Sequence, residues 1–222
     1  MALNPDAKGG STNKLPEVGL QPARCFAIIE LGLQPSSFKG VVGEPKQEVM
    51  VCFELTKYMN KYEDKEYPTT INQKYGWSAG TKAKLPDVLK SWGSLKTRPE
   101  KIVIKPYLGQ YCFLNISHSE DGKYANIASA GRGINPFMKG MERPSKFHAD
   151  IYFEIPVKLK DFDWNLFFKL PPYAQKLIRG CGEWQAIIQA SPEPTKTMEQ
   201  AQQSQMMEEE GEVFTNDDAP AF

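Results

Sequence analysis

Lysines and aromatic rings interleave along residues 57–107, and their types suit a clear chemical task. A protein that binds a single nucleic acid strand without reading its sequence needs cations for the phosphates and rings on which the bases stack. Tyrosine outnumbers phenylalanine in this stretch, as expected for rings that keep one polar edge in water. The residues predicted to contact such a strand are Tyr58, Lys74, Trp77, Lys82, Lys84, Trp92, Lys105 and Tyr107.

A second set of rings lies in residues 110–133, where two extended runs are joined at Asp121-Gly122, a pair suited to a tight hairpin. In the first run, aliphatic side chains alternate with aromatic ones, so the two kinds occupy opposite faces. We expect the aliphatic face to line a barrel interior and the rings to face outward; the opposite assignment stays open. The outward residues are then Tyr111, Phe113 and Tyr124, and the inward ones are Cys112, Leu114 and Ile116.

The loop that follows, residues 132–146, is rich in glycine and proline and carries a cluster of cations around one ring. Such a loop is well placed to fold over a bound strand, and its predicted contact residues are Arg132, Phe137 and Lys139, with Arg143 and Lys146 in the same cluster. Some rings fit a second role. Trp92 also fits a helix residue packed on the core, and Tyr107 and Tyr111 fit either core or surface.

Motifs that would support catalysis are absent from the sequence. It contains no phosphate-binding loop, no H-E-x-x-H and no G-x-S-x-G. His118 has serines and acids as neighbours, but adjacent residues on a strand and turn rarely converge on one point, so local hydrogen bonds explain it better. Asp161 and Asp163 stand beside lysines, which favours a solvated turn over a magnesium site. We therefore expect no enzymatic activity and no cofactor.

The cysteines indicate reduced thiols. Cys25, Cys52, Cys112 and Cys181 are far apart and form no C-x-x-C pair, whereas zinc sites need a tighter spacing of ligands. We expect four buried thiols and no metal. The first residues lack the apolar core of a signal peptide, and no apolar run approaches the ~20 residues that span a bilayer. The sequence thus predicts a soluble cytoplasmic protein without a membrane partner.

Charge is distributed unevenly, although bases and acids both total 27. Residues 191–222 contain eight acids and one base, which leaves 26 bases and 19 acids in residues 1–190. The body is therefore suited to polyanions, and the tail resembles one. The tail also has too few large apolar side chains to build a core, so we expect it to be disordered.

The hydrophobic pattern predicts a mainly β protein with minor α structure. Strands are expected at 23–33, 47–55, on both sides of Asp121-Gly122 and at 147–155, with a helix at 85–95 and another at 165–184 broken by Pro171-Pro172. Five antiparallel strands with helical insertions favour a five-stranded oligonucleotide-binding (OB) barrel, and a β-sandwich is the competing architecture. We divide the chain into an N-terminal arm (1–19), the OB domain (20–190) and a disordered acidic tail (191–222).

The last residues, "NDDAPAF", resemble the acidic tip of bacterial single-stranded DNA-binding proteins. The matching positions are Asp217, Asp218, Pro220 and Phe222, with Ala221 inserted before the final ring. The stretches "QPARCFAIIELGLQP", "KQEVMVCFEL" and "FLNISHSEDGKYANIASAGRG" are similar to the single-stranded DNA-binding proteins of tailed phages, over about residues 15–190.

This resemblance implies an OB core that coats and protects single-stranded DNA during phage DNA replication, recombination and repair in the cytoplasm of an infected bacterial host. It also implies a tail that recruits partner proteins of these processes. Two other classes remain as alternatives. The first is a virion or assembly protein whose β core packs against copies of itself. The second is a nuclease or annealing enzyme.

Overall fold

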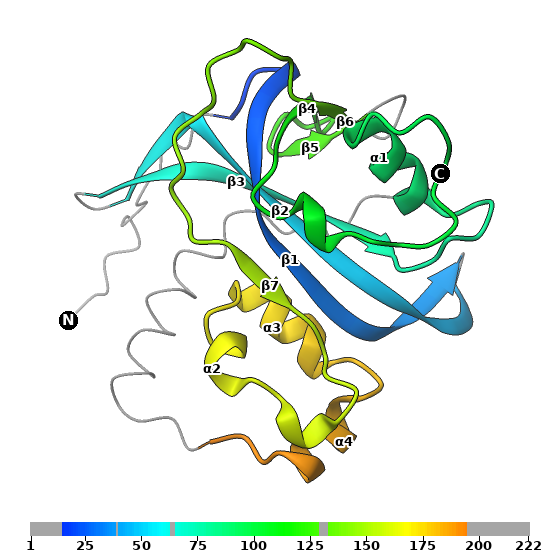
Figure 1. Cartoon of the computed structure of the whole chain (residues 1–222). Helices are drawn as coiled ribbons and strands as arrows, with labels where there is room; N and C mark the ends of the chain where they lie inside the picture. Colours follow the sequence, from blue (N-terminus) through cyan, green and yellow to red (C-terminus); the bar gives the residue numbers. More distant parts are fainter. Residues whose placement is uncertain (1–14, 39, 63–64, 129–132, 195–222) are drawn as a thin grey trace.

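The computed structural model describes residues 15–38, 40–62, 65–128 and 133–194, and one antiparallel sheet dominates them (Figure 1). The sheet has the order β3-β2-β1-β4-β5 and curls into a nearly closed barrel. Its strands are β1 (Gly19–Phe38), β2 (Val41–Tyr62), β3 (Lys65–Gly76), β4 (Tyr111–His118) and β5 (Ala125–Ile127). The short strands β6 (Ile134–Pro136) and β7 (Ile151–Phe153) pair with β4 and β1.

The last barrel strand is split into two pieces on one edge of β4. β5 pairs with the end of β4, where Ile116 faces Ile127, and β6 pairs with its beginning, where Leu114 faces Ile134. Between them Asn115 keeps both backbone hydrogen bonds: its N–H donates to Gly133 O, and its carbonyl accepts from Ala128 N. The chain therefore leaves this edge after β5 and returns to it with β6.

The helix α1 (Lys84–Trp92) connects β3 to β4 and packs into the barrel core through Leu85, Leu89 and Trp92. A five-stranded antiparallel barrel of this strand order, carrying a helix between its third and fourth strands, has the OB-like architecture. The expectation of a mainly β chain with an OB-like barrel and a few helices is confirmed. The β4–β5 hairpin also turns at the predicted place, with Gly122 at φ 68°.

One of the five strands that form the barrel differs from the prediction. Residues 65–76, expected to be a polar connection, form β3, and only Ile71 and Tyr75 on it are large buried apolar side chains. Because the rest of the strand is polar, its alternation is faint in the sequence. The predicted strand at 147–155 reduces to β7, which pairs in parallel with β1 and lies outside the barrel order.

The central strands β1 and β2 have two buried faces. Val49, Val51 and Phe53 point into the barrel, as the alternation predicts, while Met50 and Cys52 point into a second core. In β1 the register shifts between Cys25 and Ala27, which inserts one extra residue as a β-bulge. The bulge places Phe26 and Ala27 together in the second core, although neighbours on a regular strand face opposite ways.

A layer of C-terminal helices covers the outer face of β1 and β2 (Figure 1). It consists of α2 (Trp164–Phe167), α3 (Pro172–Arg179) and α4 (Trp184–Ala190), and the break at Pro171-Pro172 is as predicted. Its core is aromatic: Phe162, Trp164, Phe167 and Trp184 contact one another edge to face or at a tilt. Two short 3-10 turns, η1 (Lys105–Tyr107) and η2 (Leu159–Asp161), complete the elements.

At both ends of the predicted OB domain, residues assigned to the arm or the tail contact the folded body. In the predicted arm, the carbonyl of Pro16 lies 2.8 Å from His118 Nε2. In the predicted tail, Ser191 Oγ accepts from Trp164 Nε1 at 3.0 Å, and Glu193 pairs with Arg179 at 2.6 Å. All four cysteines are buried free thiols, as expected. Within the described residues, no helix is long and apolar enough to cross a membrane.

Gly32 is predicted to be the least replaceable glycine of β1. It has φ +75°, and a Cβ there would lie 2.9 Å from the Cβ and Sγ of Cys181 at the junction of α3 and α4. Gly32→Ala should lower the free energy of unfolding by roughly 2–4 kcal/mol, from left-handed strain and overpacking together. Urea denaturation measures the free energy of unfolding of each variant. Gly122→Ala is the matched control, because φ is +68° there and no atom lies within 4 Å of an added Cβ. Equal losses of stability in both variants would refute the close-contact argument.

Candidate nucleic-acid interface

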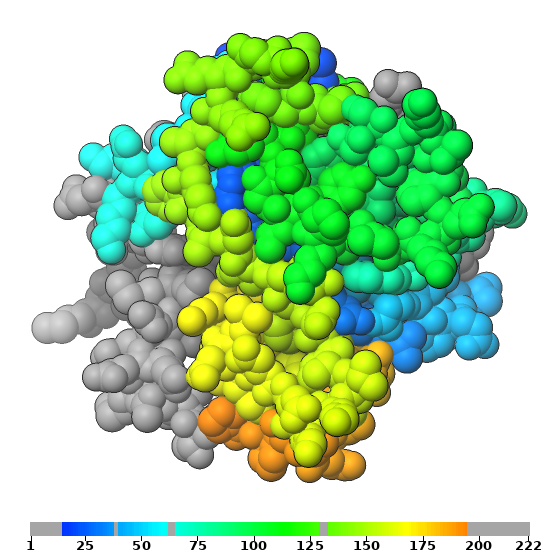
Figure 2. All heavy atoms as spheres, in the orientation of Figure 1, coloured from blue at the N-terminus to red at the C-terminus, as the bar shows by residue number. Residues whose placement is uncertain are grey.

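A groove of about 1020 Å³ lies between the connection from α1 to β4 (residues 93–110) and the loop at 136–143; we call it the first groove. Both segments reach the surface on the face drawn in Figure 2, in green and yellow-green, above the helical layer. The first groove is lined by four rings, Trp92, Tyr107, Tyr111 and Phe137, and three cations, Lys101, Lys139 and Arg143. No aspartate or glutamate lines it. Its chemistry is therefore aromatic and cationic.

Phe137 and Tyr111 are the rings best placed for stacking. Phe137 lies flat on Phe113, with ring centres 5.1 Å apart and planes 8° from parallel, and Tyr111 tilts against it at 5.7 Å. The guanidinium carbon of Arg143 lies 5.4 Å from the centre of the Tyr111 ring. The expected orientation of β4 is confirmed: its aromatic rings face outward, and Cys112, Leu114 and Ile116 fill the barrel core. Phe113 faces outward but is only 5% exposed beneath Phe137, so Phe137 presents the surface to a base.

Tyr107 and Trp92 also line the first groove, and both are held in fixed positions. The Tyr107 hydroxyl donates to the Leu89 carbonyl at 3.0 Å, and its ring lies 4.7 Å from that of Trp92. Burial raises the pKa of Tyr107. Trp92 is 5% exposed and contacts Phe53 inside the barrel. Of the two, only Tyr107 is half-exposed, and Trp92 takes the core role that the sequence left open.

The other predicted contact residues are dispersed. Tyr58 is 7% exposed, and its hydroxyl donates to Gln21 Oε1 at 2.7 Å, so its ring belongs to the core and not to a surface. Lys74 leans toward the helical layer, with Nζ 5.8 Å from the Tyr173 ring. Trp77 is half-buried against the barrel core. Lys105 is exposed, with Nζ 4.6 Å from the Tyr152 ring.

Three further predicted residues lie at the barrel surface. Lys82 and Lys84 are exposed at the start of α1, and Tyr124 borders a narrow gap between β3 and β5 that Leu15 and Pro16 also line. Arg132 and the tail residues Asp217, Asp218, Pro220 and Phe222 lie outside the described residues. The first groove thus unites Trp92, Tyr107, Tyr111, Phe137 and Lys139, although Trp92 is mostly buried, and the other described residues of the predicted set lie elsewhere.

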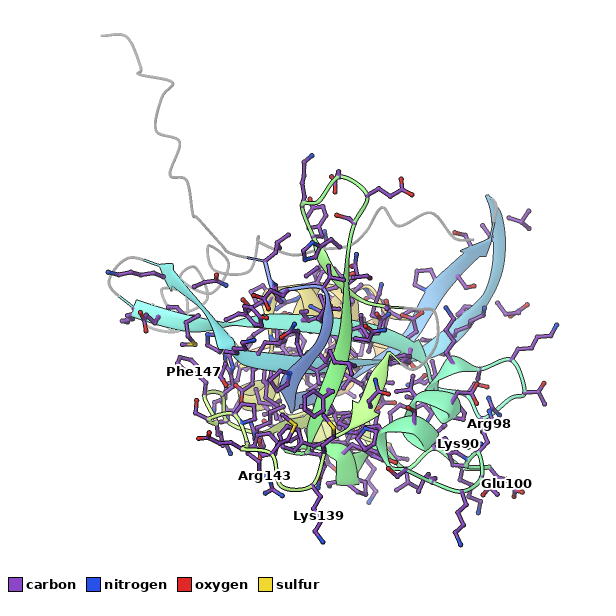
Figure 3. The ribbon with its side chains drawn as sticks, turned by 90° about the horizontal axis from the view of Figure 1, so that it is seen from above. Lys90, Arg98, Glu100, Lys139, Arg143 and Phe147 are labelled. Carbon is purple, nitrogen blue, oxygen red and sulfur yellow. The ribbon has the colours of Figure 1, made fainter. Side chains whose placement is uncertain are left out.

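Two methionines of the first groove were missed by sequence reasoning. Met138 and Met141 are 53% and 47% exposed and line it beside Lys139. Figure 3 shows Lys139 and Arg143 on this loop, pointing away from the barrel. Methionine is common on surfaces that adapt to varied partners, because its side chain is flexible and polarisable. Two methionines within four residues of a cationic loop are the signal that could have found them.

The loop is anchored by a buried carboxylate, Glu54 on β2, whose side chain is fully buried. Glu54 accepts hydrogen bonds from Arg24 at 2.9 Å, from the backbone N–H groups of Phe147 and His148 at 3.2 and 2.8 Å, and lies 2.7 Å from His148 Nδ1. Arg24 also pairs with Asp150, and donates to the His148 carbonyl at 3.2 Å. We call this set the Glu54 clasp. It fixes the chain just after the groove-lining loop onto the barrel.

Burial alone would raise the pKa of Glu54, but the hydrogen bonds from His148, Arg24 and Phe147 outweigh it and lower the pKa to about 2. The carboxylate is therefore ionised at neutral pH.

Burial raises the pKa of Cys52 to about 12, so this thiol stays protonated. Among the described residues, no group of three His, Cys, Asp or Glu side chains is arranged to hold a metal ion.

The outer face of β2 is covered from Met50 to Glu54. In OB-folds nucleic acid commonly binds across the second and third strands. Here Met50 and Cys52 of that face lie in the second core, and Glu54 lies beneath residues 147–150. The first groove lies away from this covered part of β2, and its lining combines cations with rings.

No protein-family model matches the chain, and no curated protein or solved structure is detectably similar to it.

Replacing Glu54 should weaken the protein in a pH-dependent way. The folded-state pKa lies below the ordinary value near 4.5, so the carboxylate stabilises the fold above that pH and its contribution disappears as the pH falls toward 2. We expect Glu54→Gln to lower the free energy of unfolding by roughly 3 kcal/mol at pH 7. The difference from the unmodified protein should shrink between about pH 4.5 and 2.

Urea denaturation followed by tryptophan fluorescence at several pH values measures this difference. The matched control is Glu66→Gln, which removes an exposed carboxylate on β3. A loss for Glu54→Gln that matches this control, or one that does not change with pH, would contradict the role given to the clasp.

Proposed function

We propose that this protein is a non-catalytic single-stranded DNA-binding protein and that the first groove is its binding site. The observation that supports this most is the composition of the groove: four rings and three cations line it, and none of its described lining residues is an acid. Aromatic stacking and phosphate attraction together are the means by which proteins hold single strands of any sequence.

In this proposal, Arg143, Lys139 and Lys101 attract the phosphates, and Phe137 and Tyr111 each stack a base. Stacking contributes about 1–3 kcal/mol per base and needs a base whose face is free. Bases inside a duplex have no free face, so the proposal includes a preference for single strands. Met138 and Met141 add adaptable apolar contacts, which suit bases of different shape.

The biological role rests on the resemblance to phage proteins and is proposed with it. The protein would coat and protect single strands during phage DNA replication, recombination and repair in the bacterial cytoplasm. Its acidic tail would recruit proteins of those processes, with Phe222 entering an apolar pocket on the partner and its α-carboxylate meeting a cation there.

Removing two groove cations should weaken DNA binding and its salt dependence. For Lys139→Ala with Arg143→Ala, we expect lower affinity for a labelled oligothymidylate, and a slope of log K against log salt that is smaller by about 1.4, or about 0.7 for each lost phosphate contact. Tyr111→Ala should cost about 1–3 kcal/mol of binding with an unchanged salt slope. Fluorescence anisotropy at several salt concentrations measures both.

The matched control is Lys158→Ala with Lys160→Ala, which removes the same charge from exposed positions at η2, beside the helical layer. An equal loss in this control would mean that only net charge matters. If the unmodified protein fails to bind the oligomer at low salt, the proposed function falls. Equal affinity for a duplex of matched length would replace it with general polyanion binding.

Deleting residues 195–222 tests the acidic tail. A polyanionic segment competes with DNA for a cationic surface, so we expect the truncated protein to bind the oligomer equally well or more tightly. The truncation retains Ser191 and Glu193, which bond to the helical layer. A clear loss of affinity in the same anisotropy assay would be incompatible with this role.

A further inference from the structure

A second groove, of about 630 Å³, lies between α1 and the split strand β5–β6. Lys84, Lys90 and Ser91 of α1 line one side of it, and Ile127 and Ile134 line the other. It contains the same combination of cations and apolar surface as the first groove, but without exposed rings.

The two grooves meet at the turn that ends α1. Ser94, Leu95 and Pro136 line both of them, so the two hollows adjoin at these residues. Leu95 is 41% exposed at this junction, where an apolar side chain can contact a base passing from one groove to the other.

The junction has an unusual residue in a common backbone motif. The N–H groups of Ser94 and Leu95 donate to the carbonyls of Ser91 and Lys90, at 3.2 and 2.9 Å, which is the Schellman ending of a helix. Glycine normally occupies the left-handed position of this motif, but here it is Ser94, with φ 52°. Ser94 is exposed and lines both grooves, so its hydroxyl is accessible to a ligand at this junction.

The charges of the second groove are available to a polyanion. Lys84 and Lys90 are exposed, and the one acid that lines this groove, Asp87, is paired with Arg98 at 2.8 Å. Figure 3 shows Lys90 and Arg98 on the α1 side of the molecule, apart from Lys139 and Arg143. Ser91 Oγ is the one buried side-chain polar atom without a hydrogen-bond partner in the described part of the chain.

We propose that the two grooves form one continuous path for single-stranded DNA, an inference that rests on the proposed function of the first groove. A short strand occupies the first groove, because the stacking rings are there. A longer strand passes over Leu95 into the second groove, where Lys84 and Lys90 hold its phosphates and Ser94 donates a hydrogen bond to it.

The test compares labelled oligothymidylates of about 4 and about 12 nucleotides, two lengths within the range of site sizes known for single OB-folds. For Lys84→Ala with Lys90→Ala, we expect roughly tenfold weaker binding of the longer oligomer and unchanged binding of the shorter one, measured by anisotropy at one salt concentration. The control is again Lys158→Ala with Lys160→Ala, and thermal melting verifies that each variant is folded.

Unchanged binding of the longer oligomer would overturn the continuous path while leaving the first groove as a binding site. Equal weakening for both lengths would also overturn it, since that pattern reflects charge acting at a distance. Absence of binding to either oligomer by the unmodified protein would remove the proposed function and this inference together.

Ser94→Gly tests the role of the Ser94 hydroxyl in binding without disturbing the fold. Because glycine suits φ 52° better than serine does, this variant should melt at an equal or higher temperature. We expect it nevertheless to bind the longer oligomer a few-fold more weakly than the unmodified protein does. Unchanged affinity for the longer oligomer would exclude the Ser94 hydroxyl from the path.

Discussion

The arrangement of the proposed binding surface depends on the Glu54 clasp. Glu54 and His148 are 94 positions apart in the sequence, and their contact returns the chain to β2 after a long loop. A fully buried carboxylate is stabilising only when its hydrogen bonds are complete, and here two backbone N–H groups, one guanidinium and one imidazole supply them. Since the loop at 136–143 lines the first groove, the groove exists in this form because the clasp holds the end of that loop.

The helical layer explains why the groove lies where it does. It covers the outer face of β1 and β2, which leaves the far side of the barrel, around α1 and β4, for contact with other molecules. The β-bulge at Phe26 is part of the same arrangement, because it gives the layer two adjacent side chains to pack against. An OB-like barrel is thereby combined with a proposed binding surface built mainly from connections, with Tyr111 of β4 beside them.

Much of the fold could be predicted from the sequence, and the failures have physical causes. Alternating apolar residues in β2 and β4 identified their inner faces, and the Asp121-Gly122 turn and Pro171-Pro172 break were visible locally. β3 was missed because Thr69 and Gln73 share the inward face with Ile71 and Tyr75, at positions where a buried strand usually carries aliphatic side chains. A one-residue bulge such as that at Phe26 has no reliable sequence signal.

The candidate site was harder to predict than the fold. Tyrosine and tryptophan pack in cores as readily as they bind at surfaces, so composition could not separate Tyr58 and Trp92 from Tyr111. Phe137, Lys139 and Arg143 were recognised as a cluster, but their meeting with Tyr107 and Lys101 depends on long-range contacts of the loop. Periodicity within a segment carries no information about such contacts.

The two-sided burial of β1 and β2 has a consequence for cooperativity. The same two strands form a wall of both hydrophobic cores, with Val51 and Phe53 on one side and Met50 and Cys52 on the other. If either core were lost, the apolar side chains of β1 and β2 that it buries would be exposed. The other core needs the same two strands as its wall. We therefore expect the barrel and the helical layer to unfold together in one cooperative transition.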